Sequence, residues 1–289
     1  MKTPLRDPRD AAYEQALIYA REMRELYRTN RATAQNVQTR KEATERIERV
    51  LHDVEALTTV FQPIKDLRTG RAVGVEALSR FTGPMARTPD VWFTEAEEVG
   101  LLHELDLRAA RAALGHYGRI PAGAYLSVNL SPDSAHAPGF ADLVGSIPCN
   151  RLVVEITEHA PVHDYDALAV ALTPFRRSGG RLAVDDAGSG FASLRHILRL
   201  APDVIKLDVD LVRGIDLDPA RRALARALIS FAQDINAVIV AEGVETEDEL
   251  KTLRVLGVSY AQGFYLGRPG PLEERLKVER RARPRRNRA

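Results

Sequence analysis

The sequence predicts a closed β/α barrel of the TIM type, and two observations lead to this prediction. Between residues 60 and 270, eight short apolar runs alternate with segments long enough to form helices. Alternation of this kind over about 210 residues is typical of a closed barrel rather than of an open sheet. Several of the apolar runs also end in a polar side chain, which indicates a site at the end of the barrel where the strands converge.

The predicted strands are short, and predicted helices separate most of them. We expect strands at 60–64, 72–78, 125–130, 152–157, 182–185, 204–207, 238–241 and 262–266. We expect helices at 104–116, 166–177, 192–200, 219–235 and 246–256. Residues 66–71 between the first two strands contain Thr69 and Gly70 and are too few for a helical crossover, so this pair should be antiparallel. The predicted fold is therefore a TIM-like (β/α)8 barrel with an antiparallel first strand, preceded by N-terminal helices.

Two amphipathic helices are predicted ahead of the barrel. The first covers residues 10–28, and the second follows a polar stretch at 29–39. The apolar positions of the second helix are Ile47, Val50, Leu51, Val54 and Leu57. These helices form either a linker or oligomerisation segment, or helices that simply pack on the barrel. We therefore divide the chain into an N-terminal segment at 1–58, a barrel at 59–274 and a basic tail at 275–289.

The formal net charge of +1 hides an uneven distribution of charge along the chain. Residues 275–289 carry a net charge of +7 and residues 1–46 a net charge of +3, so residues 47–274 carry −9. We expect the tail to be disordered, because its composition cannot form a core. The alternative is that the tail contacts an anionic partner: nucleic acid, anionic lipid or an acidic protein. No aromatic side chain lies among its arginines to stack on bases, which argues against sequence-specific nucleic-acid binding.

Cysteine content and hydropathy narrow the expected setting of the protein. Cys149 is the single cysteine, so neither an internal disulfide nor a cysteine-built metal site can form. No run of about 18 apolar residues is present, and the first residues lack the apolar segment of a secretory signal. We therefore expect a cytoplasmic protein without a membrane span.

Several predicted strands end in polar side chains that are embedded in apolar sequence. These side chains are Glu76, Asn129, Glu155, Glu158, Asp185, Asp186, Lys206, Asp208, Glu242 and Glu245. Buried carboxylates that lie close together repel one another unless a cation compensates for their charge. One lysine is too little for this, and an oxygen-rich set of ligands favours Mg²⁺ or Mn²⁺ over zinc. The sequence therefore predicts a divalent metal site at the C-terminal end of the barrel.

The adjacent residues Asp185 and Asp186 indicate a site for two metal ions. Neighbouring side chains of a strand face opposite sides, so both aspartates can reach one site only where the strand ends. Gly188 and Gly190 are expected to provide that end. Two ions a few ångströms apart are a recurrent arrangement for displacement at phosphorus. Lys206 on the next strand is expected to hold the attacking water or to stabilise the developing charge.

A set of motifs, in order along the barrel, resembles that of a known family. The motifs are FQPI (61–64), EALSRF (76–81), SVNLS (127–131), VEITE (154–158), VDDAGSG (184–190), IKLD (205–208), AEGVE (241–245) and QGFYLGRP (262–269). This set resembles the EAL-domain phosphodiesterases, which hydrolyse the bacterial messenger cyclic di-GMP. The resemblance covers residues 60–270 and implies hydrolysis to linear pGpG with two Mg²⁺ or Mn²⁺ ions per site.

The resemblance also implies roles for individual residues and partners. Metal ligation is implied for Glu76, Asn129, Glu155, Asp185, Asp186 and Glu242. Lys206 would assist the attacking water, with Glu242 as a base. Substrate contacts are implied for Gln62, Arg80, Asp106 and Gln262, and anchoring of a nearby loop for Glu158 and Glu245. The family further implies a homodimer formed through the loop after the fifth strand and the helix at 192–200. The N-terminal helices would either add a second contact to this dimer or receive a signal from an upstream sensor protein.

Two alternatives to an active phosphodiesterase follow from the same residues. The loop that begins at Asp185 reads DDAG, with Ala187 where the family commonly has phenylalanine, and in the family this loop links the metal site to the dimer interface. We expect the loop to be altered in its packing but still competent, since all the ligands are present. The first alternative is a catalytically inactive barrel that binds cyclic di-GMP and signals to a protein partner. The second makes the basic tail the functional part, and it predicts salt-dependent DNA or RNA binding that disappears when residues 275–289 are deleted.

Overall fold

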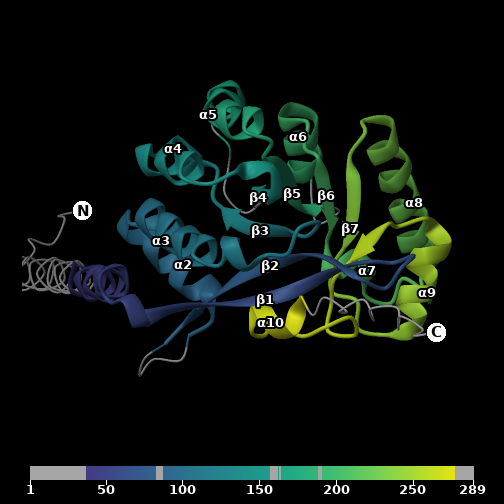
Figure 1. Cartoon of the computed structure of the whole chain (residues 1–289), viewed down its shortest axis with the longest axis horizontal. Helices are drawn as coiled ribbons and strands as arrows, with labels where there is room; N and C mark the ends of the chain where they lie inside the picture. The colour runs from purple at the N-terminus through teal and green to yellow at the C-terminus, as the bar shows by residue number, and fades with distance from the viewer. Residues whose placement is uncertain (1–36, 83–86, 157–161, 163, 188–190, 277–289) are drawn as a thin grey trace, which may run out of the picture.

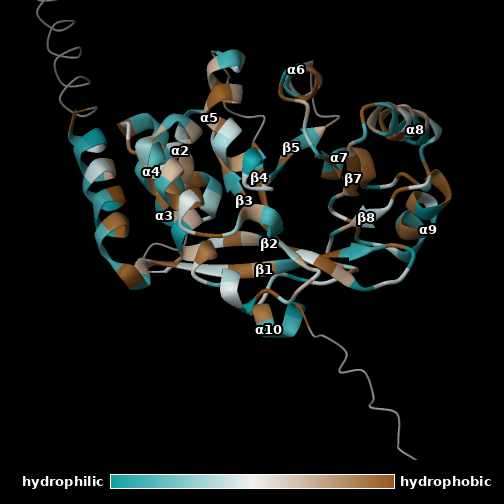
Figure 2. Cartoon of the chain, turned by 45° about the horizontal axis from the view of Figure 1, so that its top comes forward, coloured by the Kyte–Doolittle hydropathy of each residue, from teal (hydrophilic) through white to brown (hydrophobic). Residues whose placement is uncertain are grey.

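Eight strands form a closed barrel in the order β1 to β8. Figure 1 labels β1 to β7, and Figure 2 labels β8 next to β7. The computed structural model describes residues 37–82, 87–156, 162, 164–187 and 191–276. β1 is antiparallel to both of its neighbours, β2 and β8, whereas all other neighbouring pairs are parallel. The predicted barrel with an antiparallel first strand is thereby confirmed. The strands are β1 (Leu57–Asp66), β2 (Ala72–Phe81), β3 (Tyr125–Leu130), β4 (Leu152–Ile156), β5 (Arg181–Ala187), β6 (Val204–Leu207), β7 (Val238–Ala241) and β8 (Tyr260–Ala261).

Helices cover the outside of the barrel and carry both hydrophilic and hydrophobic residues (Figure 2). They are α2 (Pro89–Val99), α3 (Leu102–Leu114), α4 (Pro138–Gly145), α5 (Tyr165–Arg177), α6 (Phe191–Leu200), α7 (Val209–Val212), α8 (Pro219–Asp234), α9 (Glu247–Leu256) and α10 (Leu272–Arg275). The five helices predicted from the sequence are α3, α5, α6, α8 and α9. Local signals set their starts, since Asp218 caps α8 ahead of Pro219 and Thr246 forms a capping box with Glu249 in α9. No helix in the described parts of the chain is long and apolar enough to cross a membrane.

The eighth strand is shorter than predicted and lies earlier in the chain. β8 ends at Ala261, so the predicted strand at 262–266 is wrong. The backbone turns at Gly263, which has a φ of 154°. A Cβ atom at this position would lie 2.1 Å from the backbone nitrogen of Val244, so only glycine fits the close approach of the two segments. This turn places Gln262 at the end of the strand.

Residues 37–52 are helical and pack on the side of the barrel. Ile47 and Val50 are buried in one cluster with Trp92 and Ala96 of α2 and Leu105 of α3. The prediction of a polar, non-helical stretch up to residue 39 is therefore wrong for residues 37–39. The predicted helix at 10–28 and the tail from residue 277 onward lie outside the described residues, and the proposed division of the chain into three segments stays a prediction.

The far end of the predicted second helix also differs from the structure. Val54 lies in a separate 3₁₀ turn, Val54–Ala56, and Leu57 is the first residue of β1. Val54 is exposed, so its helical spacing from Val50 does not reflect a shared buried face.

The interior of the barrel changes from apolar to charged along the strands. Alternate residues of a strand share a face. In each of four strands, an apolar residue that faces the interior is followed two positions later by a charged residue. These pairs are Val153 and Glu155, Ala183 and Asp185, Val204 and Lys206, and Val240 and Glu242. The apolar members form one buried cluster with Ile64. The charged members therefore form a second layer directly above it, at the C-terminal ends of the parallel strands, where barrels of this type place their sites.

Candidate active site

Lys206 lies at the centre of the charged layer. Its Nζ is 2.6 Å from Oε2 of Glu155, 2.8 Å from Oε1 of Glu242 and 3.2 Å from Oδ1 of Asp185. Oε2 of Glu76 is 3.7 Å away. The lysine side chain is only 2% exposed, so one ammonium group shares a largely buried environment with four carboxylates. Glu155, Asp185 and Glu242 lie at or near the ends of their strands, whereas Glu76 lies in the middle of β2 and not at the strand end predicted from the sequence. The sequence predicted that these residues meet, and the structure brings them together.

Amide and hydroxyl groups hold the carboxylates in place. Nδ2 of Asn129 donates to Oε1 of Glu76 at 2.9 Å, and Oγ of Ser127 donates to Oε1 of Glu155 at 2.5 Å. Nε2 of Gln262 donates at 2.6 Å both to Glu76 and to Glu242. The other amide atom of Gln262, Oε1, is buried without a hydrogen-bond partner among the described residues. An acceptor oxygen therefore remains available inside the cluster.

Asp185 and Asp186 both face the cluster, although they are neighbours in β5. Asp186 has a φ of 55°, a left-handed conformation that aspartate tolerates better than most residues. The pairing of β5 with β6 is irregular between Val184 and Ala187, so the alternation of faces breaks at this point. β5 continues through Ala187, directly before Gly188, so both aspartates lie within the strand, and the break that turns them toward one site lies at Asp186 rather than at the strand end. Ala187 is fully buried in the main core.

The carboxylates outnumber the cations in this cluster. Glu76, Glu155, Asp185, Asp186 and Glu242 together with Lys206 have a formal net charge of −4. Burial raises the pKa of Glu155 to about 8 and raises the pKa of Glu242, with nearby carboxylates adding to both shifts. Burial lowers the pKa of Lys206, but the surrounding carboxylates outweigh it and the pKa rises. The residues as they stand therefore attract further positive charge.

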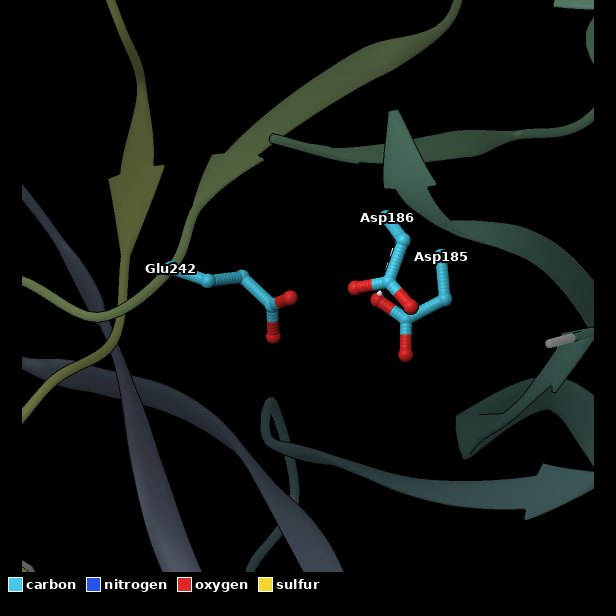
Figure 3. A group of neighbouring side chains, drawn as sticks. All are labelled: Asp185, Asp186 and Glu242. Atoms are coloured by element: carbon cyan, nitrogen blue, oxygen red, sulfur yellow. Dashed lines mark hydrogen bonds between the residues drawn. The ribbon is translucent and has the colours of Figure 1, made fainter. Parts of the chain in front are cut away.

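The geometry of three carboxylates fits a metal ion. One oxygen each from Asp185, Asp186 and Glu242 lies within 4.8 Å of the other two. Figure 3 shows Glu242 reaching toward the two aspartates from the end of β7. Carboxylate and amide oxygens are the ligands that Mg²⁺ and Mn²⁺ prefer. The chemistry of the donors and their excess of negative charge therefore fit hard divalent cations.

A pocket of about 430 Å³ opens beside this cluster, between β2, β3, α2 and α3. Arg80, Asp106 and Asn129 are among its polar lining residues, whereas Phe93 and Leu102 contribute to its apolar walls. Asp106 is 6% exposed, and burial raises its pKa, although hydrogen bonds from neighbouring serines oppose the shift. Since Asn129 also donates to Glu76, the pocket and the carboxylate cluster share a side chain.

The remaining predicted site residues occupy different surroundings. Gln62 is buried in β1, lies opposite Glu76 in the pairing with β2, and donates to the carbonyl of Gly267 at 3.2 Å. Glu245 does not join the cluster, because its side chain is 45% exposed and pairs with Arg213 at 3.2 Å. Glu158 lies outside the described residues.

Sequence reasoning missed several polar residues near the site. Ser127 lies two residues before Asn129 in β3, and the alternation of faces would have identified it. Ser131 and Ser134 hydrogen-bond to Asp106 and follow directly after β3. No comparable signal exists for α2, whose contribution to the pocket wall depends on how the helix packs.

Comparison with known proteins identifies the family of this barrel. The family model described as the EAL domain matches residues 45–269, which is more than half of the chain. The chain belongs to the EAL domain family. The family resemblance predicted from the ordered motifs is thereby confirmed.

Two curated relatives illustrate the similarity to other EAL domain proteins. The protein named "Probable cyclic di-GMP phosphodiesterase PdeN" from Escherichia coli is 30% identical over 232 residues, which is 76% of this chain and 45% of that protein. The bifunctional diguanylate cyclase/cyclic di-GMP phosphodiesterase MucR from Pseudomonas aeruginosa is 34% identical over 254 residues, which is 82% of this chain and 35% of that protein. The chain thus spans less than half the length of these curated relatives.

Solved structures show the same barrel. The PaMucR phosphodiesterase in its c-di-GMP complex superposes with a TM-score of 0.71 at 30% identity, over 81% of this chain and 99% of that chain. The manganese/cy-diGMP complex of Klebsiella pneumoniae BlrP1 superposes with a TM-score of 0.67 at 30% identity, over 75% of this chain and 57% of that chain.

Proposed function

We propose that this protein hydrolyses cyclic di-GMP to linear pGpG in a metal-dependent reaction. The observation that carries the proposal is the cluster around Lys206, where five carboxylates and the amide of Asn129 meet beside a pocket of about 430 Å³. The similarity to proteins named as cyclic di-GMP phosphodiesterases, and to EAL domain proteins solved with this nucleotide, supports the choice of substrate.

We further propose two Mg²⁺ or Mn²⁺ ions as cofactors. Their ligands would be Glu76, Asn129, Glu155, Asp185, Asp186 and Glu242. The formal charge of −4 on the cluster supports this number, because two divalent ions would neutralise it. When bound, such ions activate the attacking water and stabilise the leaving oxygen at phosphorus. The calcium and manganese complexes of Klebsiella pneumoniae BlrP1 support a divalent cation in this family.

The side chains of the cluster would share the remaining chemistry. Lys206 would orient the attacking water and stabilise the negative charge that develops on the phosphate. Glu242 would accept a proton from this water, because its carboxylate lies within the cluster, 2.8 Å from Nζ of Lys206. Gln262 would hold the carboxylates of Glu76 and Glu242 in fixed positions relative to each other, since its amide donates a hydrogen bond to both. Addition of water to phosphorus breaks one P–O bond and leaves a terminal phosphate and a free hydroxyl.

Residues beside the cluster would bind the rest of the substrate. Arg80 lines the pocket, and a guanidinium group suits a phosphate because it donates two parallel hydrogen bonds. Asp106 lines the same pocket and would accept hydrogen bonds from a guanine. Gln62 lies opposite Glu76 across β1 and β2 and would contact the substrate from that side.

A homodimer through α6 is part of the same proposal. Ile197 and Leu200 of this helix are buried against the barrel, whereas Leu198 is 70% and Leu194 is 41% exposed. Two exposed leucines on one helix support a contact with a second copy of the chain. The links between the N-terminal helices and an upstream sensor, and between the basic tail and an anionic partner, stay predictions from the sequence.

The test separates hydrolysis from binding alone. The full chain is incubated with cyclic di-GMP and Mn²⁺, and the nucleotides are resolved by liquid chromatography, with isothermal titration run in parallel to measure binding. Glu242→Gln serves as the matched control, since it retains the shape of the side chain and removes its charge. We expect pGpG from the wild type and intact cyclic di-GMP from the control. Binding by the wild type without any linear product would instead support the inactive sensor.

A further inference from the structure

Asp106 is held through one of its two carboxylate oxygens. Oδ2 accepts the backbone N–H of Ser131 at 3.0 Å, the hydroxyl of Ser131 at 2.5 Å and the hydroxyl of Ser134 at 2.7 Å. Within the described residues, no hydrogen bond is formed to Oδ1. Since Asp106 lines the pocket, Oδ1 is the oxygen that remains for a bound molecule.

The hydrogen bonds around Ser134 also fix the state of a neighbouring histidine. Ser134 has one hydroxyl hydrogen, and both Oδ2 of Asp106 and Oγ of Ser131 lie 2.7 Å from its oxygen. This hydrogen is therefore used inside the network, and the oxygen of Ser134 is left to accept. Nδ1 of His103 lies 3.1 Å away and must donate, which places a proton on Nδ1.

The network connects two elements that form walls of the pocket. His103 and Asp106 lie one turn apart on the same face of α3, and Ser131 and Ser134 follow the end of β3. Ser134 is fully buried, whereas His103 is exposed at the surface. The carboxylate plane of Asp106 cannot rotate without breaking the hydrogen bonds that converge on Oδ2, and hydrogen bonds to charged groups are the stronger kind.

We infer that Ser131, Ser134 and His103 are positioning residues that hold Asp106 ready to accept the N–H edge of a guanine, and that they thereby set the base selectivity of the pocket. The inference rests on the proposed function, because guanine enters as part of the proposed substrate. Guanine presents the adjacent donors N1–H and N2–H on its Watson–Crick edge, whereas adenine presents an acceptor at N1. An oriented carboxylate oxygen therefore favours guanine, and enzymes that read an unpaired base use this edge.

Two variants test the inference, together with a matched control. Ser134→Ala removes one hydrogen-bond donor to Asp106. His103→Phe removes the donor to Ser134, and because His103 is exposed, this substitution should not destabilise the fold. Ser146→Ala is the control, because its hydroxyl donates to the carbonyl of Leu143 at the end of α4. For each protein we measure KM and kcat on cyclic di-GMP, the dissociation constants of cyclic di-GMP and cyclic di-AMP, and the hydrolysis of bis(p-nitrophenyl) phosphate, which carries no base.

The expected effect is confined to recognition of the base. Ser134→Ala should raise KM and the dissociation constant for cyclic di-GMP about tenfold, which corresponds to about 1.4 kcal/mol. It should change kcat, the affinity for cyclic di-AMP and the hydrolysis of bis(p-nitrophenyl) phosphate less than about twofold, a limit of about 0.4 kcal/mol. His103→Phe should shift the same constants in the same direction by a smaller factor, and Ser146→Ala should match the wild type.

The outcomes separate this inference from the proposed function. A folded Ser134→Ala variant with an unchanged preference for cyclic di-GMP over cyclic di-AMP overturns the inference. A fall in kcat and in bis(p-nitrophenyl) phosphate hydrolysis at constant KM also overturns it, because the serine would then act through the carboxylate cluster. If the wild type binds cyclic di-GMP without hydrolysing it, the hydrolytic proposal fails while the binding constants still decide the inference. If the wild type does not bind cyclic di-GMP, both fail.

Discussion

Replacing Lys206 by methionine tests whether its ammonium group compensates for the negative charge of the carboxylate cluster. Lys206→Met keeps the length of the side chain and removes the ammonium group, which lies within 2.8 Å of Glu155 and Glu242. Removal of one partner from a buried ion pair destabilises a protein by about 3–5 kcal/mol. In a protein of this size, 1 kcal/mol shifts the Tm by about 2–4 °C. We therefore expect the metal-free variant to melt at least about 6 °C below the wild type.

Thermal unfolding followed by circular dichroism, in EDTA and in excess Mn²⁺ at neutral pH, measures this effect. Lys251→Met is the matched control, because the exposed ammonium of Lys251 lies 3.1 Å from Glu247 and from Asp248 and such pairs contribute about 0–1 kcal/mol. Excess Mn²⁺ should recover more of the Tm in Lys206→Met than in the wild type, since binding to the native state stabilises it. A metal-free Lys206→Met variant that melts within about 2 °C of the wild type would refute the role of Lys206 in charge balance.

Three further predictions concern the site, the N-terminal helix and the dimer. Glu76→Ala should lower turnover of cyclic di-GMP at least about 100-fold while changing the Tm little, because reduced repulsion among carboxylates offsets the lost contacts; retained turnover contradicts the ligand assignment. Glu95→Gln removes the negative charge and one of the two oxygens that accept from Arg46 at 3.2 Å and from Arg87 at 3.1 Å, and should lower the free energy of unfolding in urea by about 1–2 kcal/mol at neutral pH. Arg46 holds the pKa of Glu95 below its usual value of 4.5. The difference in unfolding free energy between the variant and the wild type should therefore be present above about pH 4.5 and should shrink as the pH falls through the lowered pKa. A difference that stays constant over this pH range would contradict the role of the Glu95 charge. Leu198→Asp on α6 should convert the dimer to a monomer in light scattering, and a wild type that is monomeric and active would contradict the proposed dimer.

The barrel could be predicted because most of its strands are short apolar runs that end in a polar residue. The eighth strand could not, because residues 262–266 have a strand-like composition that includes Phe264 and Tyr265. Both aromatic side chains are about half exposed, at 49% and 47%. The turn at Gly263 depends on how closely the segment approaches Val244, which is a property of the folded chain and not of the local sequence.

The members of the carboxylate cluster could also be predicted, but their arrangement could not. Strand ends converge in a barrel, so Glu76, Glu155 and Glu242 were expected to meet. The sequence does not show that Gln262 bridges two of these carboxylates or that Ser127 holds a third. These contacts depend on the register of strands that are far apart in the chain.

The end of the N-terminal helix shows the limit of a periodic pattern. Val54 and Leu57 continue the helical spacing of Ile47 and Val50, yet residues 37–52 are helical and Leu57 already belongs to β1. Two apolar residues can match a period by coincidence, because strands supply apolar residues as well. Burial excludes only Val54, which is 78% exposed, whereas Leu57 is buried in the same cluster as Ile47 and Val50 but reaches it from β1.

The rate of pGpG formation by the full chain, measured while Mn²⁺ is titrated into metal-free protein, tests the proposed function most directly. We predict no product in EDTA and a rate that rises and saturates as Mn²⁺ binds, because five carboxylates around one lysine need divalent cations before they can act on a phosphodiester. Cyclic di-GMP that is bound but stays intact at saturating Mn²⁺ would contradict the proposal, as would an equal rate of hydrolysis in EDTA.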